Sequence, residues 1–135
     1  MSVIKPKISE SEYHKDMVVS KSKLLLIRDE FHFLNQLINS YVFEPNTPNL
    51  FERLQDYKTK LDQLHTKYDH MFGLLTDHDN ELDGLMECDT IVCETAYDEK
   101  HIMIMELLDD FVDTFQELKS SIFKYCGSIL KKHKK

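Results

Sequence analysis

A seam of apolar side chains that runs from Leu50 to Leu85 constrains the fold of this chain more than any other feature. Steps of three and four residues along it reach eleven positions, of which ten are apolar or aromatic and one, His78, is polar. The ten are Leu50, Leu54, Tyr57, Leu61, Leu64, Tyr68, Met71, Leu75, Leu82 and Leu85. A spacing of about 3.5 residues held for this long predicts a long amphipathic helix whose apolar face packs against other helices.

Similar seams lie on either side of this one. The first runs from Tyr13 to Tyr41 and is interrupted only by Ser20, and the third runs from Tyr97 to Ile129 with His101 as its single polar member. The first seam predicts a helix of about 34 residues, roughly 50 Å long at the usual rise per residue. Ser9 and Ser11 can each serve as its N-cap. Glu12 follows Ser9 at the spacing of a capping box.

Two breaks separate the three seams. The segment Glu44-Pro45-Asn46-Thr47-Pro48 ends the first helix, because a proline and the residue before it both disfavour helix continuation. Thr47 and Pro48 fit the N-cap and the first position of the second helix. The second break lies within residues 87–96, where the competing N-caps are Asp89, Thr90 and Thr95.

Three helices with short connections predict an all-α fold, an antiparallel up-down-up bundle. We expect a single domain over residues 1–135, with flexible ends at about 1–8 and 131–135. A break of the second helix near residue 76 would give four helices, but the seam keeps its phase there, which favours continuity. The bundle resembles spectrin-type three-helix repeats in outline, although the chain lacks the Trp that those repeats usually bury.

Composition excludes several function classes. The net charge of −7 argues against general binding to nucleic acid or to anionic membranes. The longest aliphatic runs, Leu24–Ile27 and Ile102–Met105, are too short to cross a membrane, and residues 1–8 do not resemble a signal peptide. Three cysteines, Cys88, Cys93 and Cys126, are an odd number without a framework spacing, which predicts reduced thiols in a cytoplasmic protein.

Two histidines on apolar seams are the most specific candidate site. Antiparallel pairing brings five titratable residues towards one end of the bundle: His14, His78, His101, Glu81 and Asp98. The favoured interpretation is structural: each buried histidine either loses its charge or keeps it beside a carboxylate, and an ordinary pair of this kind would have a raised histidine pKa. The alternative is a small metal-binding bundle in which these residues hold a divalent transition metal as its only cofactor.

The second candidate site is an apolar patch. Residues 102–105 are apolar all round the predicted helix, so something besides one seam must cover them. Either Ile91 and Val92 fold over the patch, or these two residues share an interface with Ile102, Met103 and Met105. Because no catalytic motif is present, we expect a non-enzymatic protein that acts in protein–protein interaction. The expected partner is another protein or a second copy, with a homodimer as the simplest self-association.

Overall fold

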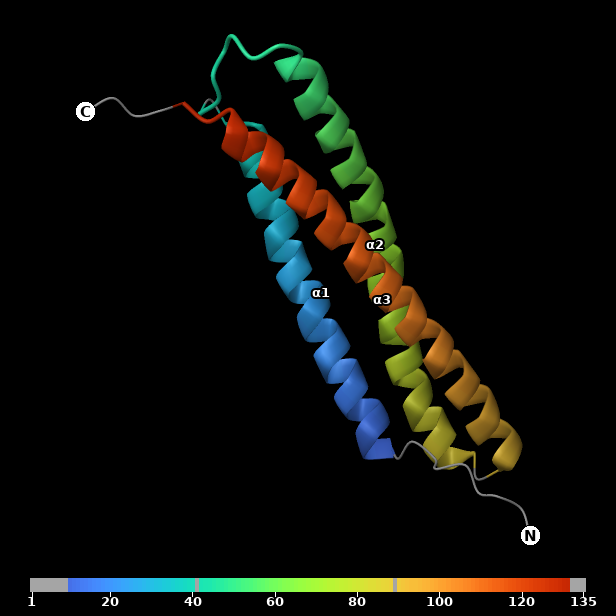
Figure 1. The fold of residues 1–135 in the computed structure, drawn as a ribbon. Coiled ribbons are helices and arrows are strands. Elements are labelled where there is room, and N and C mark those ends of the chain that lie inside the picture. Colours follow the sequence, from blue (N-terminus) through green and yellow to red (C-terminus); the bar gives the residue numbers. More distant parts are fainter. Residues whose placement is uncertain (1–9, 41, 89, 132–135) are drawn as a thin grey trace.

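The computed structural model contains three α-helices and describes residues 10–40, 42–88 and 90–131. Helix α1 spans Glu10–Ile38, α2 spans Leu50–Glu87 and α3 spans Ile91–Ser128 (Figure 1). The predicted all-α fold of three helices is therefore confirmed. The predictions for Ser9, Tyr41, Asp89 and the chain ends 1–8 and 132–135 lie outside the described residues.

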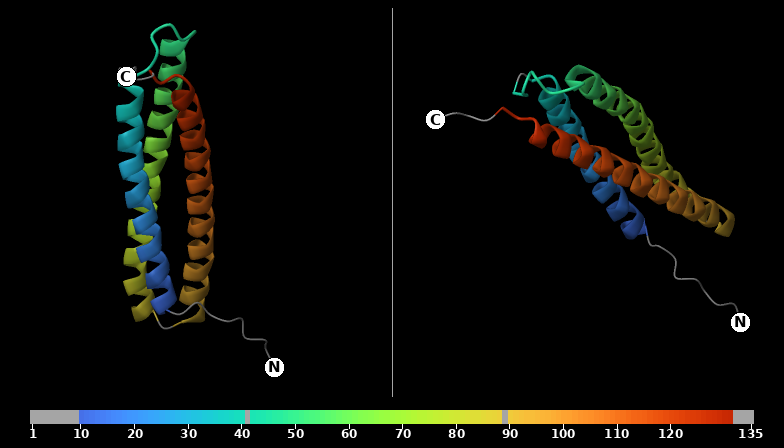
Figure 2. Two further views of the ribbon diagram at one scale, coloured as in Figure 1. Left: turned by 60° about the vertical axis from the view of Figure 1, so that its left-hand side comes forward. Right: turned by 45° about the horizontal axis from the view of Figure 1, so that its top comes forward.

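The helices run up, down and up, so α1 and α3 are parallel and α2 is antiparallel to both (Figures 1 and 2). Helix α2 packs more extensively against α1 and α3 than these two pack against each other. None of the described helices combines the length and apolar character needed to cross a membrane.

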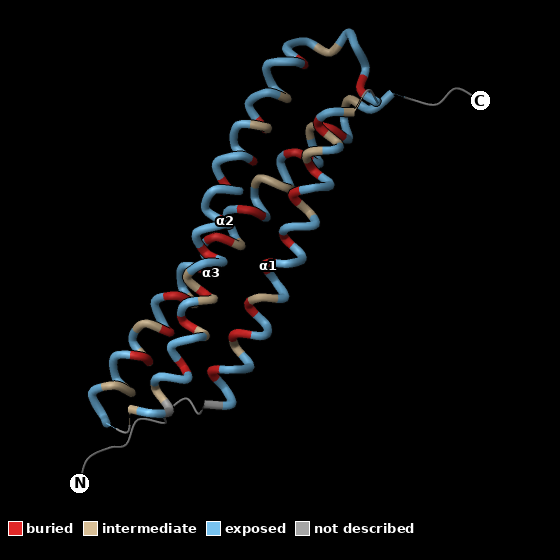
Figure 3. The backbone as a smooth tube through the Cα atoms, turned by 180° about the vertical axis from the view of Figure 1, so that it is seen from behind, coloured by how far each residue is buried: buried red, intermediate tan, exposed pale blue. Residues whose placement is uncertain are grey.

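The seams form the core, as the sequence predicts. Buried positions recur along the inner side of each helix (Figure 3). Leu34, Leu61 and Phe111, one residue from each helix, are all buried. Helix α2 is continuous through residues 73–80, so the four-helix alternative is wrong.

The first helix is shorter than predicted, and tertiary contacts explain its end. Helix α1 contains 29 residues and stops at Ile38. The chain then turns so that Phe43 is buried and forms an isolated antiparallel bridge with Leu130. In this bridge the Glu44 amide donates to the Ile129 carbonyl at 2.8 Å. A contact between the first connection and the far end of α3 thus replaces the last turn of the predicted helix.

The start of α2 also differs from the prediction. Thr47 is not the N-cap: its hydroxyl donates to the Glu44 carbonyl at 2.7 Å. Asn49 takes the N-cap position with φ of 58°, a left-handed conformation that asparagine tolerates better than most residues. Thr47 therefore stabilises the connection rather than the helix.

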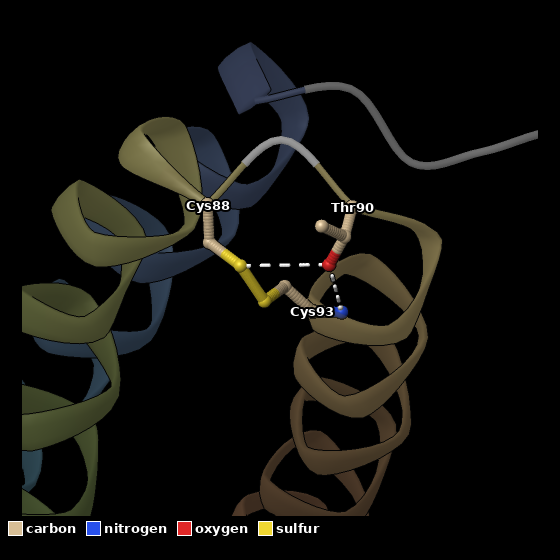
Figure 4. Close-up of a disulfide and its surroundings, with 3 residues drawn as sticks. All are labelled: Cys88, Thr90 and Cys93. Carbon is tan, nitrogen blue, oxygen red and sulfur yellow. Dashed lines mark hydrogen bonds between the residues drawn. A yellow bond between two sulfur atoms is a disulfide. The ribbon is translucent and has the colours of Figure 1, made fainter.

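The turn between α2 and α3 is tighter than predicted. Of the three competing caps, Thr90 is the N-cap of α3, and its side chain accepts a hydrogen bond from the Cys93 amide at 3.3 Å (Figure 4). Cys88 and Cys93 form a disulfide across this turn, so the prediction of reduced thiols is wrong for these two cysteines. Cys126 is free and buried.

Candidate functional site

A hydrogen-bonded pair of histidines joins the three helices near the α2–α3 turn. Nε2 of His78, on α2, lies 2.9 Å from Nδ1 of His101, on α3. The other ring nitrogen of His101, Nε2, lies 2.8 Å from a carboxylate oxygen of Asp16 on α1. The two histidines are only 0% and 1% exposed. Both rings are therefore almost fully shielded from solvent.

For a neutral pair of rings, the hydrogen-bond partners imply which nitrogens carry a hydrogen. A carboxylate only accepts hydrogen bonds, so Nε2 of His101 carries a hydrogen. In the neutral His101 ring, Nδ1 is then an acceptor, and Nε2 of His78 donates to it. Nδ1 of a neutral His78 is therefore unprotonated.

That remaining nitrogen, Nδ1 of His78, is the one ring nitrogen of the pair for which the described residues supply no hydrogen bond. It is buried, and it has no hydrogen-bond partner within the described residues. Glu81 is the nearest carboxylate, at 3.8 Å, beyond hydrogen-bonding distance. Glu81 instead pairs with Lys100 at 2.6 Å.

Two tyrosines enclose the pair. The Tyr97 ring stacks on His78 with centroids 4.2 Å apart, and its hydroxyl donates to the His78 carbonyl at 3.3 Å. Tyr13 packs edge-on against both Tyr97 and His101, and its hydroxyl donates to Asp98 at 3.1 Å. These aromatic contacts fix the orientation of the rings and complete their burial.

Burial shifts the pKa values of His78, Tyr13 and Tyr97. Loss of solvent lowers the pKa of His78 below its ordinary value, and the proximity of His101 lowers it further. Glu81 acts in the opposite direction but does not outweigh these effects on the His78 pKa. Burial, followed by the hydrogen bond to Asp98, raises the pKa of Tyr13 to about 12. Burial also raises the pKa of Tyr97. Of the two options for a seam histidine, His78 therefore loses its charge.

The structure brings some of the predicted site residues together and separates others. His78 and His101 are in contact, and Glu81 lies beside His78 as predicted. His14 is exposed, and Asp98 pairs with Tyr13. The sequence interpretation missed Asp16, the carboxylate that holds His101; its spacing of three residues from Tyr13 on the first seam was the available signal.

The alternative of a metal site would require these side chains to rearrange. Three of the four ring nitrogens of His78 and His101 already take part in protein hydrogen bonds. Among the described residues, no group of three or more His, Cys, Asp or Glu side chains is arranged to hold a metal ion. The metal alternative stays a prediction, which metal analysis of protein purified without a nickel column would test.

The predicted interface residues of α3 fall into two groups. Ile91, Val92, Ile102 and Met103 are exposed, so the idea that the first two cover the patch is wrong. Met105 is half-buried and accepts a hydrogen bond from the Ser20 hydroxyl at 3.6 Å. Met105 therefore belongs to the packing of α1 against α3.

A wider set of exposed apolar side chains borders the line where α1 meets α3. On α1, Val19, Leu26 and Phe33 recur every seven residues and share one side of the helix. On α3, Ile102 and Phe123 are exposed. The rings of Phe33 and Phe123 touch across the two helices, with centroids 6.0 Å apart. These five residues define the outer α1–α3 face.

Comparisons with known proteins found no relative of this chain. No family model matches the chain, and no curated protein and no solved structure shows significant similarity to it.

Proposed function

We propose that this chain is a non-enzymatic interaction protein that binds another helical surface through its outer α1–α3 face. The observation that carries the proposal is the stripe of Val19, Leu26 and Phe33, which lies outside the core seam of α1. Apolar side chains at regular helical spacing on an exposed side are typical of helix–helix interfaces.

The position of the stripe follows from ion pairs and hydrogen bonds. Asp16 and Glu30 reach α3, where they contact His101 and Lys119. Val19 and Phe33 follow these two acidic residues by three positions, so they are neighbours on the helix surface. The stripe therefore borders α3, where a further helix could pack against α1 and α3 together.

Self-association is the simplest form of this interaction, with a homodimer joined through two outer α1–α3 faces. The acidic character of the chain, with its net charge of −7, disfavours nucleic acid or an anionic membrane as the partner. The cytoplasmic location expected from the sequence rested on reduced thiols, and the Cys88–Cys93 disulfide removes that support. The buried rings of His78 and His101 support a structural function for the histidine pair within the bundle.

Charge substitution on the face tests the proposal. We expect Leu26→Glu and Phe33→Glu each to weaken self-association at least about tenfold, because a desolvated carboxylate would replace an apolar contact. Phe51→Glu is the matched control, since Phe51 is 84% exposed on the first turn of α2, outside this face. Sedimentation equilibrium measures the association, and circular dichroism checks that helicity is retained.

A wild-type chain that stays monomeric at about millimolar concentration would contradict self-association. Equal weakening by Phe51→Glu would contradict the assignment of the face. Met103→Glu distinguishes the face from the predicted patch at residues 102–105, because Met103 is exposed but lies outside the five residues that define the outer α1–α3 face.

A further inference from the structure

The disulfide between Cys88 and Cys93 connects two helix ends of opposite polarity. Cys88 is the C-cap of α2, and Cys93 lies in the first turn of α3 (Figure 4). Their Cα atoms are 6.2 Å apart, within the usual range for a disulfide. The bond therefore fastens the end of α2 to the start of α3 across a turn of residues 88–90.

We propose that Cys88 and Cys93 form a reversible thiol–disulfide site that a small dithiol opens without unfolding the chain. This inference is independent of the proposed interaction function. In the first step, a thiolate of the dithiol attacks one sulfur and the other sulfur leaves as a thiolate. The second thiol of the reagent, as a thiolate, then attacks the reagent sulfur of the mixed disulfide and the protein sulfur leaves as a thiolate. In total, two electrons and two protons reduce the cysteine pair while the dithiol becomes a cyclic disulfide.

The surroundings of the bond allow such a reagent to approach. Both cysteines are half-buried, and they line a surface hollow between α2 and α3. Gly84 and Ala96, two of the smallest residues, line the same hollow. The space around the Gly84 Cα is open, because a Cβ built there would have no neighbour within 4 Å. The bond is therefore at the surface rather than in the core.

The helix ends determine which sulfur leaves. The amino-terminal end of α3 carries partial positive charge, which stabilises a thiolate on Cys93. The carboxyl-terminal end of α2 carries partial negative charge, which disfavours a thiolate on Cys88. Because the more stable thiolate leaves faster, we assign the Cys88 sulfur as the site of attack and Cys93 as the leaving group.

Opening the bond should loosen this end of the bundle. Tyr97 lies four residues after Cys93, one helical turn further along α3, and stacks on His78. Without the bond, the first turn of α3 is held by the Thr90 cap and by this aromatic contact. Reduction of a disulfide that closes such a short loop should lower Tm by roughly 5–10 °C.

The first test counts free thiols in the chain of residues 1–135 purified without reductant. Alkylation in denaturant should label one cysteine, Cys126, before treatment and all three after the folded chain is exposed to dithiothreitol. We also expect Tm to fall by roughly 5–10 °C on reduction and to recover on reoxidation. Cys126→Ala is the control and should keep the same response.

Two results of this test would overturn the proposal. One is labelling of all three cysteines without reductant, because the pair would then not form a disulfide in solution. The other is a bond that dithiothreitol opens only in the presence of denaturant, because the site would then be inaccessible in the folded chain. A Tm that is the same in both redox states would overturn the inferred fastening of α2 to α3.

A second test addresses the direction of attack with single variants. Cys88→Ser leaves Cys93 as a thiol, and Cys93→Ser leaves Cys88. At neutral pH, iodoacetamide should alkylate Cys93 in the first variant about fivefold or more faster than Cys88 in the second, because helix ends shift thiol pKa values in opposite directions. Equal rates, or faster alkylation of Cys88, would overturn the assignment of Cys93 as the leaving group.

Discussion

At the scale of single residues, the environment of His78 determines how stability depends on pH. Burial lowers its pKa in the folded chain. In the unfolded chain, His78 takes up a proton around its ordinary pKa of about 6.5, whereas the folded chain does so only at lower pH. The contribution of His78 to stability is therefore fully present above about pH 6.5 and is lost as the pH falls towards the folded pKa.

We accordingly expect the free energy of unfolding to decrease as the pH is lowered from about 7.5 to 5.5. The decrease due to His78 is at most about 1.4 kcal/mol per pH unit. Urea unfolding of the wild type and of His78→Gln measures it as the difference between their pH slopes. His14→Gln, at an exposed position, should keep the wild-type slope. Identical slopes for wild type and His78→Gln would contradict the burial of a neutral His78.

Asp16 has a separate effect, because it is the acceptor for His101. Asp16→Ala leaves a buried N–H of His101 without its partner, and we expect a loss of about 1 kcal/mol in unfolding free energy. The value lies at the low end of the usual range because the Asp16 side chain is 44% exposed and solvent can partly replace it. His14→Ala should change stability by less than half as much, and equal losses would argue against the Asp16–His101 bond.

The sequence predicted the histidine pair but not its carboxylate. Spacing alone places His78 and His101 on facing seams, because the period and the turns set the register to within about one helical turn. Within that uncertainty along the axis, His14 and Asp16 lie at similar heights. They lie about 200° apart around α1, and the spacing of three residues from Tyr13 was the signal that favours Asp16 as the residue that faces His101.

At the scale of helices, core packing predicts the largest stability effects. Leu34→Ala and Leu61→Ala should each cost about 2–5 kcal/mol, because both residues are fully buried and each truncation leaves a cavity. Leu26→Ala is the matched control on α1, where 60% of the residue is exposed, and it should cost well under 1 kcal/mol. Denaturant unfolding measures all three. Similar costs at Leu26 and Leu34 would contradict the assignment of the inner face of α1.

Helix interiors were predictable for a reason that does not extend to helix ends. Each seam repeats its signal many times, so one polar residue such as Ser20 does not hide it. An end depends on one or two interactions. Helix α1 stops early because Phe43 bridges to Leu130, which belongs to the other end of the chain. Thr90, and not Thr95, is the N-cap of α3, and it lies in the short turn that the Cys88–Cys93 bond spans.

At the scale of the whole molecule, the histidine pair reports on the register of all three helices. Asp16, His101 and His78 form one line of hydrogen bonds from α1 through α3 to α2. A slip of any helix by one turn, about 5.4 Å, would break this line. Buried polar groups of this kind can select one packing arrangement among several that bury similar apolar surface.

The most direct test of this account is nuclear magnetic resonance of the histidine side-chain nitrogens at neutral pH. We expect His78 and His101 both to carry their hydrogen on Nε2, with the His78 hydrogen shared with Nδ1 of His101 across 2.9 Å. Both ring hydrogens should exchange slowly with solvent, because the residues are 0% and 1% exposed. Fast exchange at both rings, or a His78 ring that titrates at the ordinary pKa of about 6.5, would contradict the proposed arrangement of the three helices.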